Sequence, residues 1–224
     1  MSGLIKVIEP FRFYTRLHLS ELTGLRASNL SQLLSTVKQV SGSCVYHHTH
    51  RFLQQHQYLS PEPPNDFAYW VSKVLGEDEL GERLASIDTV QFSTVRKLRD
   101  KIIATIEDYL KNNMSVKLKF AGEGEEFHFI KSISFILPTN YIAYNLREFV
   151  DIVKNITIDS IYFHIFESRL RLEKKTNDFS NWIETSIGDK ESSDKISRLD
   201  PYTHTLEDLR KTIIKIVEQK LRDQ

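Results

Sequence analysis

The chain has 224 residues and carries 30 basic side chains against 30 acidic ones, so its formal net charge is zero. This balance argues against a nucleic-acid-binding protein, because neutralising phosphates normally requires a basic excess. The single cysteine, Cys44, excludes a disulfide framework and a cysteine-rich zinc site. The first residues lack a signal peptide's apolar core, and no apolar run approaches the roughly 18 residues of a membrane span. We therefore expect a cytoplasmic protein that binds neither nucleic acid nor membranes.

The chain carries one sequence pattern twice. Phe11-Arg12-Phe13 recurs 116 residues later as Phe127-His128-Phe129, and Asn65-Asp66-Phe67 recurs 112 residues later as Asn177-Asp178-Phe179. Matches in the same order along the chain predict an internal duplication. The predicted organisation is a first helical repeat over residues 1–112, a connector and β turn over 113–126, and a second helical repeat over 127–224.

Each predicted repeat begins with a short strand, at the alternating aromatic residues 11–14 and 127–130, and residues 132–136 extend this strand in the second copy. About five helices follow. In the first repeat, they are a helix around residues 30–37, a second from Ser43, a third from Asn65, a short fourth toward Ile87 and a long fifth over residues 95–109. The predicted fold class is mainly α with a small β component, in which two tandem pseudo-symmetric helical repeats share a small sheet.

Turns are predicted at two kinds of position near the predicted strands. Gly24 aligns with Asn140, and both residue types accept a positive φ, so we expect a left-handed turn there. Residues 116–120 predict an extra strand, and the acidic, glycine-containing segment 121–126 predicts a hairpin turn rather than a nucleotide-binding loop.

The motif Tyr46-His47-His48-Thr49-His50, followed by Asn65-Asp66-Phe67-Ala68-Tyr69-Trp70 and Asn177-Asp178-Phe179-Ser180-Asn181-Trp182, resembles the signature of an uncharacterised prokaryotic domain-of-unknown-function family. The resemblance covers nearly the whole chain. It implies a prokaryotic source and transfers no catalytic residue, so it leaves the function open.

Histidines provide the densest chemistry in the sequence. His48 recurs as His164, and at helical spacing both share a face with apolar residues. Such imidazoles are usually partly buried and hydrogen-bonded, so we predict a structural role for both.

A second stripe differs between the copies. His47 and His50 share it with Arg51 and Gln54, whereas the second copy has apolar residues there, namely Phe163, Phe166 and Leu170. The polar stripe is either a solvated or interface surface or a ligand-binding site that includes Asp66. Zinc would need a third ligand, for which the available residues are Asp66, Glu62, His56 and His18. We predict that His47 and His50 are at least partly accessible and that the chain binds no metal or cofactor.

The Asn-Asp-Phe-x-x-Trp element predicts the start of a helix. Asn or Asp side chains accept hydrogen bonds from the first free amides, and aromatic residues three apart share the buried face. We expect Asp66 and Asp178 to be helix caps. The residues to which this element gives a structural role are Asn65, Asp66, Trp70, Asn177, Asp178 and Trp182.

One arginine recurs in the last helix of each copy, as Arg99 and Arg210. It predicts an ion pair, with Asp88 or Asp66 in the first copy and with Asp200 or Asp178 in the second. The alternative is an anion-binding site built from both arginines.

The sequence favours a non-catalytic binding, scaffolding or regulatory protein with a protein partner or self-association. It assigns no catalytic residue, and a small-molecule ligand stays open. One alternative is a metal- or His-dependent enzyme that acts on a phosphate or sugar substrate through the His47/His50 stripe. A second is a homo-oligomeric structural protein that associates through Phe163, Phe166 and Leu170.

Overall fold

A computed structural model describes residues 8–55, 65–168, 176–199 and 204–223, without the side chains of residues 51–55 and Val90. The fold is mainly helical with a small two-stranded antiparallel sheet, as predicted. Among the described helices, none is long and apolar enough to cross a membrane. The described residues form two compact units, which we call unit 1 (residues 8–17 and from 134 onward) and unit 2 (residues 18–55 and 65–133).

The strands are β1 (Phe11–Ala27) and β2 (Phe127–Ala143). They run antiparallel, because the Thr139 hydroxyl donates to the Phe13 carbonyl and the Thr23 hydroxyl donates to the Phe129 carbonyl, each at 2.7 Å. Each strand has 17 residues and extends beyond its predicted end, by more in β1 than in β2. Gly24 is left-handed, with φ at 76°, but β1 continues through it, so the turn predicted there is wrong.

The helices of unit 2 are α1 (Leu30–Gln39), α2 (Gly42–Gln55), α3 (Asp66–Lys73), α4 (Asp78–Ala85) and α5 (Val95–Asn112), with short 3-10 helices η1 (Thr89–Gln91) and η2 (Met114–Leu118). The extra strand predicted at residues 116–120 is therefore wrong. Local bonds explain the difference, because the Val116 amide donates to Asn113 and the Lys119 amide donates to Val116, which leaves no need for a strand partner. A turn is present, with Glu125 N–H donating to the Gly122 carbonyl at 3.1 Å, but it connects no pair of strands, so the predicted hairpin is wrong.

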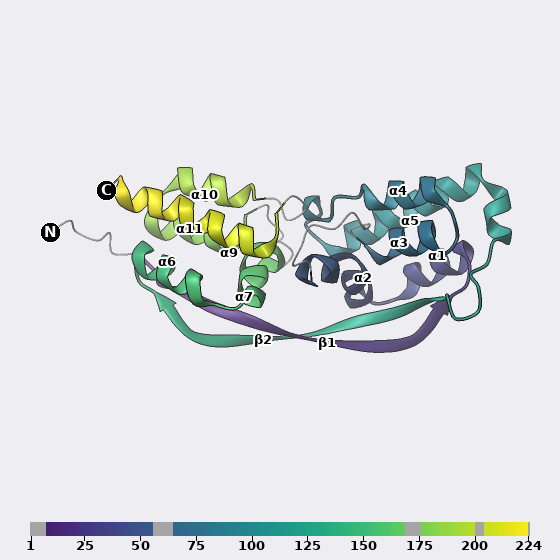
Figure 1. The fold of residues 1–224 in the computed structure, drawn as a ribbon, viewed down its shortest axis with the longest axis horizontal. Helices are drawn as coiled ribbons and strands as arrows, with labels where there is room; N and C mark the ends of the chain where they lie inside the picture. The colour runs from purple at the N-terminus through teal and green to yellow at the C-terminus, as the bar shows by residue number, and fades with distance from the viewer. Residues whose placement is uncertain (1–7, 56–64, 169–175, 200–203, 224) are drawn as a thin grey trace. The chain divides into compact units, whose positions relative to one another are not determined.

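The helices of unit 1 are α6 (Leu146–Asn155), α7 (Ile158–Tyr162), α9 (Asp178–Trp182), α10 (Lys190–Ser197) and α11 (Leu206–Arg222), with π-helical segments η3 (Phe163–Glu167) and η4 (Ile183–Ile187). In each unit the helices lie over one face of that unit's strand segments (Figure 1).

The compact units do not coincide with the predicted segments 1–112 and 127–224, because each unit contains the start of the strand assigned to the other repeat. The Phe11 ring lies 5.6 Å from Trp182 in unit 1, and the Phe127 ring lies 5.8 Å from Trp70 in unit 2. Antiparallel pairing is the reason. It brings the start of β2 beside the end of β1, which leads directly into α1, so Phe127 meets the helices that follow β1.

Cys44 lies in the core of unit 2 and is fully buried. Burial raises the pKa of its thiol to about 11. Because the thiolate is the reactive form, we expect Ellman's reagent to label the native chain at pH 8 at least about a hundredfold more slowly than the chain in guanidinium. Complete labelling of the native chain within minutes would contradict the buried position.

Candidate functional site

His48 lies on α2 and uses both of its ring nitrogens. Its Nδ1 is 2.7 Å from the Asp66 carboxylate, and the Ile130 amide donates to its Nε2 at 2.9 Å. A main-chain N–H can only donate, so Nε2 carries no proton and the proton sits on Nδ1, facing Asp66. This buried imidazole therefore links the start of α3 to the backbone of β2.

His164 makes the same set of contacts in unit 1. Its Nδ1 is 2.8 Å from the Asp178 carboxylate, and the Tyr14 amide donates to its Nε2 at 2.9 Å. We call each histidine, its aspartate and the strand amide a strand clamp. The sequence indicated the two buried, hydrogen-bonded histidines but did not indicate that a strand amide is the second partner.

The helix caps are asparagines. Asn65 accepts from the Ala68 amide at 2.8 Å, and Asn177 accepts from the Ser180 amide at 2.9 Å. The prediction that the neighbouring aspartates are caps is therefore wrong. Asn65 has the extended backbone of a cap, with φ at −155°, whereas Asp66 is already the first helical residue. Its carboxylate is consequently directed to the histidine.

The two tryptophans hold the chain just before each strand. The Trp70 indole donates to the Glu125 carbonyl at 2.7 Å, and the Trp182 indole donates to the Glu9 carbonyl at 2.8 Å. Each clamp is thus reinforced by a second side-chain bond to the same strand start.

The predicted accessibility of His47 and His50 is wrong, because they are only 6% and 5% exposed. Contacts with other residues of unit 2 offset the cost of burying these two polar rings. His47 Nδ1 lies 3.1 Å from the Ser132 hydroxyl, and the His50 ring stacks on Tyr46 at 4.8 Å. His18 also stacks on Tyr46, at 6.0 Å, and does not join the group around Asp66. The side chains of Arg51 and Gln54, and the whole of Glu62, His56 and Leu170, lie outside the described residues.

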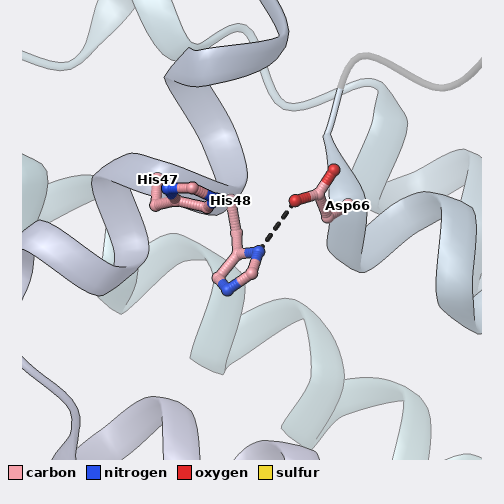
Figure 2. A group of neighbouring side chains, drawn as sticks. All are labelled: His47, His48 and Asp66. Carbon is pink, nitrogen blue, oxygen red and sulfur yellow. Dashed lines mark hydrogen bonds and ion pairs between the residues drawn. The ribbon is translucent and has the colours of Figure 1, made fainter. Parts of the chain in front are cut away.

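His47, His48 and Asp66 form the group whose potential metal ligand atoms lie within 4.8 Å of one another. Figure 2 shows His48 extending toward Asp66, with His47 on the other side of the His48 side chain in this view. The sequence had grouped His50 with His47 instead.

The protonation of His48 opposes metal binding by this group. A metal on Nδ1 would displace its proton to Nε2, which faces the N–H of Ile130. In unit 1, Phe163 replaces His47 while the His164 clamp persists, so the clamp does not require a metal.

Arg99 and Arg210 bind main-chain carbonyls at helix ends. Arg99 donates to the Val40 carbonyl at 2.7 Å, after α1, and Arg210 donates to the Ile156 carbonyl at 2.7 Å, after α6. Among the described residues neither arginine pairs with Asp88, Asp66 or Asp178, so these predicted ion pairs are wrong, and Asp200 lies outside the described part of the chain. Arg210 pairs instead with Glu207 at 3.0 Å, and the alternative of an anion-binding site stays a prediction. The last carbonyls of a helix lack helical partners, so they are natural acceptors for a guanidinium group.

Comparisons with known proteins found a matching family model and a similar solved structure. The model of DUF5752, a family of unknown function, matches residues 8–218. A solved structure, entitled "The structure of OrfY from Thermoproteus tenax", has a TM-score of 0.81 and 28% identity and covers 96% of each chain. The search of curated proteins gave no match.

The two clamps are expected to differ in strength, because the Asp66 side chain is 52% exposed and the Asp178 side chain only 18%. We expect Asp178→Ala to lower the free energy of unfolding by about 2 kcal/mol and Asp66→Ala by about 1 kcal/mol. Amide exchange provides the matched control. It should accelerate at Tyr14 in the first variant and at Ile130 in the second, and acceleration at the same amide in both variants would contradict the assignment.

The His47 group is expected not to retain zinc. We predict that the chain, after incubation with zinc and dialysis, holds the same substoichiometric amount as His47→Phe, which introduces the residue found in the second copy. Elemental analysis measures this. One zinc per chain that disappears in His47→Phe would refute the tautomer argument.

Proposed function

The chain belongs to the DUF5752 family, whose function is unknown, and we propose a role for it from its own exposed residues. We propose that it is a non-catalytic binding protein that associates with protein partners through exposed apolar residues of its two strands.

The exposed strand residues carry this proposal. Of the 14 large apolar side chains exposed among the described residues, eight lie on β1 and β2, at between 44% and 69% exposure. Unit 1 contributes Leu17, Phe135, Ile136, Leu137 and Tyr141, and unit 2 contributes Leu19, Leu22 and Leu25. Exposed apolar side chains that are concentrated on two strands, rather than scattered over the surface, are typical of a protein-binding surface.

The strand edges support the same proposal. In the described part of the chain β1 and β2 pair only with each other, so each strand has an edge without a strand neighbour. Such an edge presents main-chain groups that another chain can pair with, unless the protein protects it.

The alternatives have less support. An enzyme based on the His47/His50 stripe would need an accessible imidazole, but both rings are buried. A homo-oligomer built on Phe163 and Phe166 would need these rings at the surface, but they are 1% and 5% exposed. Self-association through the strands remains compatible with our proposal.

Internal duplication is also part of this proposal. Beyond the clamps, Lys38 pairs with Glu107 at 2.6 Å and Lys154 pairs with Glu218 at 2.8 Å, at positions matched by the sequence pattern. Interactions that recur at aligned positions support a common origin for the two helical sets.

Substitution of exposed strand residues tests the proposal. We expect Phe135→Ser/Leu137→Ser to reduce at least about tenfold the partner protein recovered with the tagged chain from its native cells, or the dimer fraction in light scattering. The thermal melt should change little, since both side chains are half exposed.

Leu118→Ser is the control, because Leu118 is 80% exposed and lies outside the strands. The proposal is wrong if the strand variant and the control recover the same partners and show the same mass, or if the wild type is monomeric and recovers no partner.

A further inference from the structure

Unit 1 contains an open pocket beside the His164 clamp. Its walls come from the start of β1 and from α9 and η4, and its volume is about 610 Å³. Pockets for small molecules commonly measure roughly 300–1,000 Å³. The chemically relevant lining residues are Glu9, Arg12, Tyr14, Asp178, Asn181 and Ser186.

Several polar side chains in this pocket are not used by the fold. Among the described residues, the Arg12 guanidinium, the Glu9 carboxylate, the Asn181 amide and the Ser186 hydroxyl have no hydrogen-bond or ion-pair partner. These groups are therefore available to a ligand.

The charges in the pocket are mixed. Arg12 supplies one positive charge, whereas Glu9 and Asp178 supply two negative charges. A simple anion would bind Arg12 but face two carboxylates, and a simple cation would leave Arg12 unpaired. A molecule with both charges satisfies both signs, and the rings of Phe11 and Trp182 offer an apolar wall beside them.

At the matched positions, unit 2 repeats only the two carboxylates, as Glu125 and Asp66. There, His128 replaces Arg12, Tyr69 replaces Asn181 and Val74 replaces Ser186. The clamp and the two carboxylates are thus common to both units, while Arg12, Asn181 and Ser186 are particular to unit 1. A purely structural role would not require this difference.

We propose that this pocket binds a zwitterionic α-amino acid with an apolar side chain. Arg12 pairs with the carboxylate, and Glu9 and Asp178 attract the ammonium group. Asn181 and Ser186 add hydrogen bonds, and the side chain lies against Phe11 and Trp182.

Calorimetry with three probes tests this assignment on the full chain. The probes are L-leucine, isocaproate, which lacks the amino group, and isoamylamine, which lacks the carboxylate. We expect leucine to bind at least about tenfold more tightly than either single-charge probe, because each of these loses one charge-assisted pairing.

Substitutions in the pocket are compared with the equivalent substitutions in unit 2, which shows whether leucine binds in the pocket or elsewhere on the surface. Arg12→Gln and Asn181→Ala should each weaken leucine binding about fivefold or more, whereas the equivalent unit 2 changes, His128→Gln and Tyr69→Ala, should leave it unchanged. Because Arg12 and Asn181 are exposed, thermal melts should show that all variants fold.

Three results would overturn the proposal. The first is that leucine does not bind at about 10 mM. The second is that isocaproate or isoamylamine binds as tightly as leucine, which would indicate a site for a single charge. The third is that leucine binds equally well to Arg12→Gln.

Discussion

The hydrogen bond from a strand amide to a histidine Nε2 is the constraint on which the rest of this structure depends. In unit 2 it joins His48 to Ile130, and it fixes the ring's proton on the side of Asp66. It also fixes strand register, because a slip of one residue would turn every side chain of the strand to the opposite face. In the register that the clamp fixes, Phe127 and Phe129 lie in the core. Since the same ring bonds to the start of α3 and to β2, a shift of either element alone would break one of its two hydrogen bonds.

The sequence predicted the parts of the clamp that lie within one helix or at its start, but not the strand that the clamp holds. The recurrence of His48 as His164 identified the buried imidazoles, and the Asn-Asp-Phe pattern identified where a helix starts. It did not show which strand the histidine would hold, because the partner of His48 lies 82 residues away along the chain. The burial of His47 was missed for the same reason, since Ser132 lies 85 residues away. Helical periodicity reports the faces of one element and carries no information on a distant strand.

The clamps also determine which side chains remain able to bind a ligand or to react. An imidazole that donates from one nitrogen and accepts at the other has no lone pair for a substrate proton or a metal, so the conspicuous histidines contribute to stability. Groups that the fold leaves uncommitted are better guides to function, and in unit 1 these gather around Arg12. The sequence contained this signal as a difference between copies, arginine against His128, but it was less visible than the histidine cluster. Both copies keep the clamp, but the residues around it differ. This difference indicates that the two copies have acquired different roles.

The same constraint explains how the strands can carry exposed apolar residues and still be ordered. Along β1 the buried positions are Phe11, Phe13, Arg16 and Ala27, so core packing anchors mainly its ends. Positions between these anchors contribute little to the core. Their backbone is held in place by strand pairing and by the clamps. A surface that is ordered before it meets a partner loses little conformational entropy on binding. The partner binding that we propose through residues such as Leu19 and Leu22 would therefore cost less conformational entropy than binding through a flexible loop with the same residues.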